Sequence, residues 1–189
     1  MRKTKLIQFK RKRKGLTNYK KRLDLLKSKK PRLAIRKSLN NLIIQLIQYQ
    51  PRGDKIILST HSKELRKFGW KPHLNNIPSS YLTGLLCGIK LKEKNITDFV
   101  IDVGFTRKTK NSSVFTAIKG IHDSGINLHI QEIPEERIKG SHISKYATLL
   151  RTDQDKYKKQ FSNYLKINFN PEEFENHFLE IKNKILKGN

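Results

Sequence analysis

Three short apolar runs between residues 32 and 60 place the strongest constraint on the fold of this chain. In RLAIRKS, which starts at residue 32, Leu33 and Ile35 alternate with basic or small residues, and this period of two predicts a strand with one buried and one basic face. NLIIQLIQYQ, residues 41–50, fits either a strand or a helix, but its β-branched isoleucines and the PRGD turn that follows favour a strand. KIILST, residues 55–60, predicts a third strand and completes a meander.

Residues 79–125 alternate between helical and strand patterns. Residues 79–94 predict a helix that starts behind Pro78 with a serine cap, and its apolar residues share one face: Leu82, Leu85, Leu86 and Ile89. Gly84 and Gly88 lower helix propensity, so we expect close packing of this helix against a sheet. Residues 98–105, DFVIDVGF, predict a strand buried on both sides. SSVFTAIKGIHDSG predicts a second helix, capped by Ser112 or Ser113 and ended near Gly125.

From Ile133 onward the pattern is helical and locally amphipathic, and the last helix is expected to begin at Pro171 with an acidic first turn. The chain is therefore predicted to be an α/β protein with helices packed on a mixed, partly antiparallel sheet. We expect a basic extended N-terminal arm with a short helix (1–30), an α/β body (31–130) and a C-terminal helical extension (131–189).

The charge of the chain is concentrated near its N-terminus. The formal net charge is +25, and the first forty residues hold 17 Lys and Arg against one acid, Asp24. A charge this large opposes compaction unless a polyanion neutralises it, and its clustering predicts a nucleic-acid-binding face. Residues 1 to about 22 show no buried-face period, so we expect the arm to be disordered when free. Leu23, Leu25 and Leu26 are expected to anchor a short helix that Pro31 stops.

The sequence also indicates which classes of protein to exclude. The lone Cys87 forms no internal disulfide, and no Cys/His cluster has zinc spacing, so we expect a reducing compartment and no structural metal. RKTKLIQFKRKRK lacks the apolar core of a secretory signal, and LIIQLI (Leu42 to Ile47) is too short to span a bilayer. We therefore expect a soluble protein with no membrane partner.

The arm is the first candidate site. Its cations would neutralise phosphates and give a large, salt-dependent affinity with little base specificity. Tyr19 and Phe9 either stack on unpaired bases, which RNA loops offer more readily than duplex DNA, or dock on the body. The predicted contacts in the arm are Lys10, Arg11, Lys12, Arg13, Lys14, Tyr19, Lys20, Lys21 and Arg22.

A second basic cluster lies in HSKELRKFGWKPH, residues 61–73, with Arg66, Lys67 and Lys71 as candidate contacts. Trp70 is either a core residue or a base-stacking platform. We favour the core slightly, because the chain has no other tryptophan to fill it.

A third cluster, TRKTKNSS, joins the last predicted strand to a helix. There Arg107, Lys108 and Lys110 lie beside free backbone N–H groups at the positive end of a helix, an arrangement that binds anions. The alternative is an ordinary charged loop. The segment lacks P-loop spacing, so we expect contact with a polyanion rather than with a nucleotide or other small-molecule substrate.

Enzymatic functions have little support in this sequence. Asp98 and Asp102 lie four residues apart, but a metal-dependent nuclease needs several converging carboxylates, and we interpret both as strand-end caps. No G-x-S-x-G motif suggests a hydrolase, and His61 and His73 have no other metal ligands nearby. We expect no catalytic residues, no metal and no cofactor.

Several motifs together resemble one known family, in its order and spacing, from about residue 9 to 150. They are KRKRKGLTNYKKRLDLLKSKKPRLAIRKSLNN, STHSKELRKFGWK, NIPSSYLTGLLCG, DVGF with NSSVFTAIKGIHDSG, and IPEERIKGSHISKYA. In these motifs the sequence resembles the archaeal form of large-subunit ribosomal protein eighteen, a family related to the eukaryotic large-subunit protein five. The TRKTKNSS loop departs from this pattern in being more basic, and beyond residue 151 the resemblance weakens.

The resemblance implies a non-catalytic protein that binds 5S rRNA and attaches it to the large ribosomal subunit in the cytoplasm. It implies a place in the central protuberance, contacts with the large (23S-type) rRNA, and neighbouring large-subunit proteins as partners. The family's basic arm corresponds to Lys10 through Arg22, and its basic loop to His61 through Lys71. Its strand edge corresponds to Arg32, Arg36 and Lys37.

Composition alone leaves other functions open. A sequence-nonspecific, chromatin-type DNA-binding protein is the main alternative, because a basic arm can equally follow a DNA groove. The alternative of an RNA-processing nuclease that depends on Asp98 or Asp102 has less support. A peripheral membrane protein has the least, since the arm has no wide apolar face.

Overall fold

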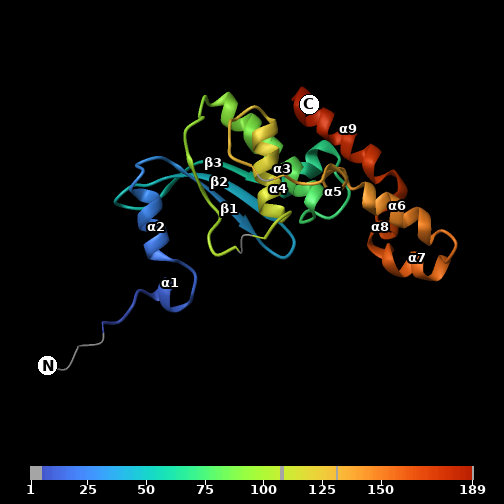
Figure 1. Cartoon of the computed structure of the whole chain (residues 1–189), viewed down its shortest axis with the longest axis horizontal. Helices are drawn as coiled ribbons and strands as arrows, with labels where there is room; N and C mark the ends of the chain where they lie inside the picture. Colours follow the sequence, from blue (N-terminus) through green and yellow to red (C-terminus); the bar gives the residue numbers. More distant parts are fainter. Residues whose placement is uncertain (1–5, 107–108, 131, 189) are drawn as a thin grey trace.

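The computed structural model describes residues 6–106, 109–130 and 132–188 (Figure 1). Its sheet has the strand order β3-β2-β1-β4, formed by β1 (Arg32–Lys37), β2 (Leu42–Gln48), β3 (Lys55–His61) and β4 (Val100–Asp102). The first three strands are antiparallel neighbours, and β4 pairs parallel to β1. The predicted meander and mixed sheet are confirmed.

Two helices cover one face of this sheet. Helix α3 (Ile77–Glu93) and helix α4 (Ser113–Asp123) close a hydrophobic core with the inward side chains of the strands. The strands contribute Leu33, Ile35, Leu42, Ile44, Leu46 and Leu58 to that core, and the helices contribute Cys87, Leu91, Val114, Ala117, Ile118 and Ile121. The alternation predicted the inward positions of Leu33 and Ile35, because strand side chains point to opposite faces in turn.

Strands β1 and β4 differ from their predictions. Arg32 and Ala34 are buried as well as Leu33 and Ile35, so the prediction of an exposed basic face at the start of β1 is wrong. The cause is tertiary, because the arm and two carboxylates cover that side. Strand β4 has only three residues and lies at the sheet edge, where Val100 and Ile101 are half-buried, so the prediction of a strand buried on both sides is also wrong.

Helix α3 begins two residues earlier than predicted. Its cap is Asn76, not a serine: Asn76 Oδ1 accepts a hydrogen bond from the Ser79 backbone N–H at 2.9 Å, and Pro78 lies in the first turn. A Cβ on Gly84 would lie 2.0 Å from the carbonyl oxygen of Ala117, and one on Gly120 would lie 2.2 Å from that of Tyr81. The glycines of α3 therefore permit close contact with helix α4, whereas we expected them to approach the sheet; Cys87 does pack in the core beneath the sheet.

Helix α4 follows its prediction. Ser112 occupies the N-cap position, although its side chain makes no capping hydrogen bond, and Gly125 has a positive φ of 99° just beyond the helix end.

The C-terminal part is helical, as predicted. It contains α5 (Glu135–Lys139), α6 (Ser141–Leu150), α7 (Gln154–Gln160), α8 (Ser162–Lys166), the 3₁₀ turn η2 (Pro171–Glu173) and α9 (Phe174–Lys187). The last helix thus begins three residues after the predicted Pro171. Together with the 3₁₀ helix η1 (Ser62–Phe68), these elements enclose a second hydrophobic cluster that includes Trp70, Tyr81, Phe174, Phe178 and Ile181.

The arm forms two short helices, α1 (Lys10–Arg13) and α2 (Tyr19–Leu26), whereas an extended arm with one helix was predicted. Asn18 caps α2, and Leu25 and Leu26 are half-buried, but Leu23 is 59% exposed and does not serve as the predicted anchor.

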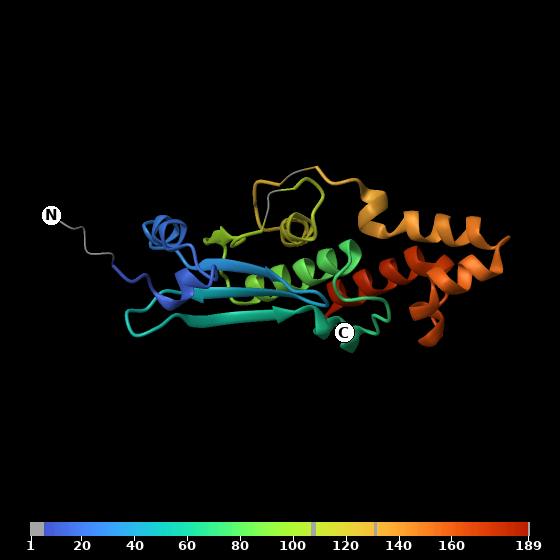
Figure 2. The same ribbon diagram turned by 90° about the horizontal axis from the view of Figure 1, so that it is seen from below.

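The molecule is elongated, with the arm at one end, the sheet in the middle and the C-terminal helices at the other end (Figure 2). The division into three segments at residues 30 and 130 stays a prediction. No helix in the described part of the chain is long and apolar enough to cross a membrane.

Candidate nucleic-acid interface

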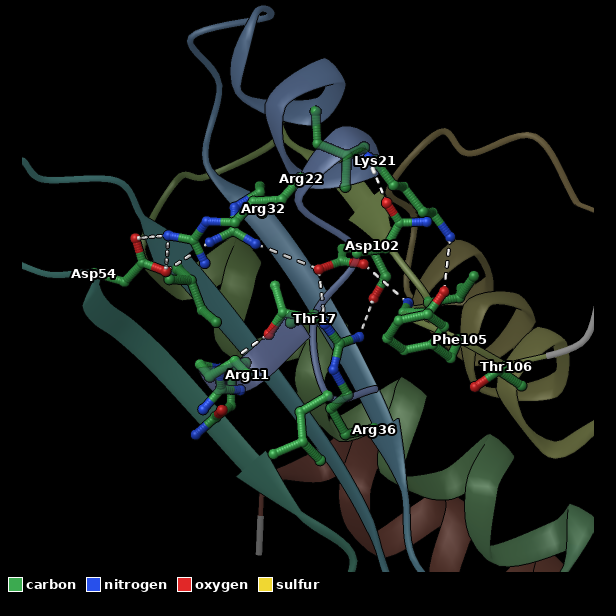
Figure 3. A pocket seen from close by; sticks show the side chains of 18 of the residues that line it. Arg11, Thr17, Lys21, Arg22, Arg32, Arg36, Asp54, Asp102, Phe105 and Thr106 are labelled. Atoms are coloured by element: carbon green, nitrogen blue, oxygen red, sulfur yellow. Dashed lines mark hydrogen bonds and ion pairs between the residues drawn. The ribbon is translucent and has the colours of Figure 1, made fainter. Parts of the chain in front are cut away.

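A cleft of about 610 Å³ lies between the arm and the sheet face opposite α3 and α4. Its walls come from α1, α2, β1, β2 and the turn after β4 (Figure 3). Six cations line it, namely Arg11, Lys21, Arg22, Arg32, Arg36 and Lys37, against the two carboxylates of Asp54 and Asp102. Segments far apart in the sequence therefore converge on one positively charged hollow.

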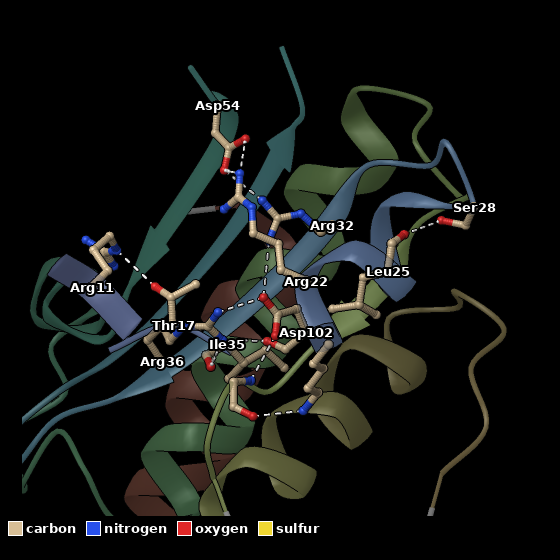
Figure 4. A network of polar contacts seen from close by, with 12 residues as sticks. Arg11, Thr17, Arg22, Leu25, Ser28, Arg32, Ile35, Arg36, Asp54 and Asp102 are labelled. Carbon is tan, nitrogen blue, oxygen red and sulfur yellow. Dashed lines mark hydrogen bonds and ion pairs between the residues drawn. The ribbon is translucent and has the colours of Figure 1, made fainter. Parts of the chain in front are cut away.

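Arg32 is at the centre of an ion-pair network beside this cleft (Figure 4). Its side chain is 5% exposed, and its Nη2 lies 2.7 Å from Asp54 Oδ2, while its Nη1 lies 3.3 Å from Asp102 Oδ2. Because both acids compensate a guanidinium that has lost its water, Arg32 supports the architecture and offers no surface to a phosphate. Arg32 was predicted to contact RNA, and its burial contradicts that prediction.

Asp102 is shared between two arginines. Arg36 Nη2 lies 2.7 Å from Asp102 Oδ2, and the Gly104 backbone N–H donates to Oδ1 at 2.9 Å. Burial raises the pKa of Asp102, but the hydrogen bonds from Arg36 and Gly104 and the charges of Arg36 and Arg32 outweigh it, so the pKa lies below its ordinary value. The carboxylate is consequently charged at neutral pH and holds both arginines in place.

The arm helix α2 is fastened to the body by polar contacts. Arg22 Nη2 donates to both carboxylate oxygens of Asp54 at 2.9 Å, and Lys21 Nζ donates to the Gly104 carbonyl at 2.8 Å. Two of the predicted arm contacts thus position the arm on the sheet, in addition to lining the cleft.

The remaining predicted cations of the arm, Lys10 to Lys14 and Lys20, are exposed. Lys10 through Lys14 lie on or beside α1 with exposed side chains, and Arg11 Nε donates to Thr17 Oγ1 at 2.9 Å. Phe9 and Tyr19 pack against each other with ring centroids 5.3 Å apart, and Phe9 is 72% exposed. Tyr19 therefore docks on an arm residue in this structure, with part of its ring still accessible.

The basic loop around η1 does not line the cleft. Trp70 is 1% exposed, its ring is stacked on that of His177 at 5.4 Å and it meets Phe174 edge-on at 5.6 Å. The alternative of Trp70 as a base-stacking platform is therefore wrong, and the core interpretation is correct. Arg66 donates to the backbone carbonyls of Trp70 and Lys71 and closes the loop.

Arg107 and Lys108 lie outside the described residues. Lys110 is exposed beside a different hollow, which Lys119 and Glu135 also line. Lys37 Nζ lies 3.2 Å from Ser113 Oγ, at the start of α4. Anion binding at this helix end stays a prediction.

Three residues that shape the cleft were not predicted to do so from the sequence. Asp54 and Asp102 are the anchors of its arginines, and Phe105 lines it with 61% of its surface exposed. Asp102 was assigned only a capping role because its partners on β1 are about seventy residues away in the chain. For Phe105 the only signal was an aromatic residue directly after a glycine turn.

The two acids considered for a nuclease, Asp98 and Asp102, are engaged in separate ion pairs. Asp98 forms an exposed ion pair with Lys30 at 2.7 Å, while Asp102 is held by arginines, so the two acids do not converge. Within residues 6–106, 109–130 and 132–188, no group of three or more His, Cys, Asp or Glu is arranged to hold a metal ion.

Comparison with known proteins assigns the chain to a family. Residues 3–98 match the family model described as "Ribosomal large subunit proteins 60S L5, and 50S L18". The chain is also 46% identical over 183 residues to the large ribosomal subunit protein uL18 of Methanococcus maripaludis, and this match covers 95% of each chain. The second match therefore includes most of the C-terminal helices, where the resemblance from motifs was weak. At this identity and coverage, the chain belongs to the family of the large-subunit ribosomal proteins 60S L5 and 50S L18.

Proposed function

We propose that this protein binds 5S rRNA and mediates its attachment to the large ribosomal subunit in the central protuberance, with contacts to the large rRNA as well. Membership of the family makes it a structural protein of the large subunit. The observation that supports the finer assignment is the continuity of the exposed cations of α1 with the cation-lined cleft on the sheet face.

The arrangement suits RNA because it combines two kinds of contact. The cations at the arm and cleft rim can neutralise phosphates, which gives affinity without reading a sequence. The cleft is a hollow that a regular duplex does not fill. The loops and bulges of rRNA present unpaired nucleotides that can enter such a hollow. Among the residues that the structure describes, we find no feature that favours the DNA-binding alternative over RNA binding.

The proposed contact residues are the predicted ones except Arg32 and Trp70, which are buried. They are the arm residues Lys10, Arg11, Lys12, Arg13, Lys14, Tyr19, Lys20, Lys21 and Arg22, the strand-edge residues Arg36 and Lys37, and the loop residues Arg66, Lys67, Lys71, Arg107, Lys108 and Lys110. The cleft residues are expected to contact one RNA surface, and the loop around η1 another, because that loop does not line the cleft. The proposed partners are 5S rRNA, the large rRNA and neighbouring large-subunit proteins.

We also propose that the protein has no enzymatic activity. The two acids that a nuclease mechanism would need are occupied by Lys30, Arg32 and Arg36.

A binding titration against 5S rRNA, transfer RNA and duplex DNA at several salt concentrations tests the proposal. We expect 5S rRNA to stay bound at salt concentrations where transfer RNA and DNA have dissociated, because a shaped site adds contacts that salt does not screen. If the three affinities fall together, charge alone explains the binding and the proposal is wrong. The location is tested by crosslinking the protein within isolated large subunits.

A further inference from the structure

The guanidinium group of Arg36 is fixed in one orientation on the wall of the cleft. Its Nη1 donates to the backbone carbonyls of Ile35 at 3.0 Å and Asp102 at 2.7 Å, and its Nη2 donates to Asp102 Oδ2 at 2.7 Å. A Cβ on Gly104 would lie 3.1 Å from Nη1 and 3.2 Å from Cζ, so the group also packs against the Gly104 backbone. The Arg36 side chain nevertheless keeps 47% of its surface exposed.

Phe105, the next residue after Gly104, is an exposed aromatic on the same cleft. It is 61% exposed, lines the cavity with Arg36, and belongs to neither hydrophobic cluster. Phe105 offers an aromatic ring that neither hydrophobic cluster uses, and Arg36 offers a guanidinium plane held in one orientation on the same cleft. Aromatic rings and guanidinium planes are both groups on which a nucleobase can stack. A phosphate alone would need only the charges and would leave the ring without a partner.

Cations surround this surface at the rim of the cleft. Arg11 and Lys21 come from the arm and Lys37 from the end of β1, while the two carboxylates of the cavity are already paired with arginines. A nucleotide that enters would therefore find positive groups for its phosphate and a flat surface for its base. The view in Figure 3 shows Arg11, Lys21, Arg36 and Phe105 in this cleft.

We propose that this cleft is a binding site for a single unpaired RNA nucleotide, whose base stacks on Phe105 and the Arg36 guanidinium while its phosphate contacts the rim cations. The inference rests on the proposed RNA-binding function and specifies the element it recognises, an extruded or looped-out nucleotide. A base within a duplex has both faces covered by its neighbours and cannot make these contacts. Asp102 is a positioning residue, because it acts by orienting Arg36.

The test is a series of substitutions at Phe105 measured by the affinity for 5S rRNA. Phe105→Ala should weaken binding roughly 5- to 150-fold, the range that stacking on one base is worth. Phe105→Tyr keeps the ring and should bind like the native protein, whereas Phe105→Leu keeps apolar bulk without a ring and should lose most of the same affinity. Because Phe105 is exposed, its variants should keep the native melting temperature.

Tyr49→Ala is the matched control, since Tyr49 is 52% exposed and does not line the cleft. It should change the affinity less than twofold. Equal losses from Phe105→Ala and Tyr49→Ala, or native affinity in Phe105→Leu, would overturn the inference.

A pair of RNA hairpins, identical except for one bulged nucleotide, separates this inference from the proposed function. The native protein should bind the bulged hairpin more tightly, and Phe105→Ala should remove the difference. Equal affinity of the native protein for both hairpins would contradict the nucleotide site, even where 5S rRNA is bound specifically. A preference for the bulge, without a preference for 5S rRNA over transfer RNA, would instead support the site and overturn the proposed function.

Discussion

At the scale of single residues, the carboxylate of Asp102 decides how two arginines are used. The sequence presents Arg32 and Arg36 as equivalent members of a basic strand, yet one is buried and the other half-exposed. Asp102 contacts both, and Asp54 completes the compensation of Arg32. The difference follows from the position of each arginine relative to these acids, because a guanidinium is buried only where its charge is balanced.

The substitution Asp102→Ala should lower the free energy of unfolding by about 3 kcal/mol, because it leaves the buried Arg32 with one of its two carboxylates. Urea denaturation measures the change. Asp98→Ala is the control, since the Asp98 side chain is 69% exposed and its pair with Lys30 should contribute less than about 1 kcal/mol. Similar effects from both substitutions would show that burial of the network adds nothing.

At the scale of elements, α9 supports the basic loop around η1. Phe174 and Phe178 of α9 are fully buried in the cluster that contains Trp70, and the His177 ring is stacked on Trp70. The Lys71 backbone N–H donates to His177 Nε2 at 3.4 Å, which requires that nitrogen to be unprotonated. The C-terminal helix thus holds the loop that carries Arg66, Lys67 and Lys71.

This contact predicts a pH dependence of stability. Burial lowers the pKa of His177, Glu180 opposes the shift, and Lys71 and Lys184 add to it. Because the folded-state pKa lies below the unfolded value of about 6.5, the unfolded state binds the proton first. The stabilisation is complete above about pH 6.5 and is lost as the pH falls through the folded-state pKa.

Chemical denaturation between pH 7.5 and 5 should therefore show a decrease in stability that is smaller in His177→Gln. His129→Gln, a change of an exposed histidine outside this contact, serves as the control and should retain the native profile. An unchanged pH profile in His177→Gln would contradict the role of this contact.

At the scale of the whole molecule, charge is separated along the long axis. Residues 1–40 hold 17 bases and one acid, whereas residues 151–189 hold eight bases and six acids. In Figure 2 helices α1 and α2 lie at one end of the molecule and helices α7 and α8 at the other, while β1 and the C-terminal end of α9 reach the middle. The RNA-facing charge should consequently lie at the arm end.

Replacing the five cations Lys10 to Lys14 by glutamine should flatten the dependence of 5S rRNA affinity on salt, by roughly 0.7 to 0.9 in logarithmic slope per lost phosphate contact. The matched control replaces five exposed lysines of the C-terminal helices: Lys156, Lys158, Lys159, Lys166 and Lys187. That variant should keep the native slope. An equal decrease of the slope in both variants would show that phosphate contacts lie at both ends of the molecule. It would contradict the prediction that they lie at the arm end.

The strand and helix patterns of the body were predictable because they arise from local periodicity. Leu33 and Ile35, or Leu82 and Leu85, point to one side by the geometry of a strand or a helix alone, and each is buried in the structure. The exposed cations of α1 were equally predictable, since a run of five consecutive bases contains no apolar residue that could bury it. Composition and periodicity by themselves thus determined the fold class, the inward-facing residues and the basic arm.

Only the tertiary structure decided which polar residues form the cleft. Gly84 was predicted to approach a sheet and instead meets α4, and Trp70 is enclosed by α9, more than one hundred residues further along the chain. Arg32, Arg36, Asp54, Asp102 and Phe105 come together because β1 pairs with β4 and the arm folds back over the sheet. Such contacts depend on long-range pairing and on the balance of desolvation against charge compensation, and neither is encoded in the spacing of neighbouring residues.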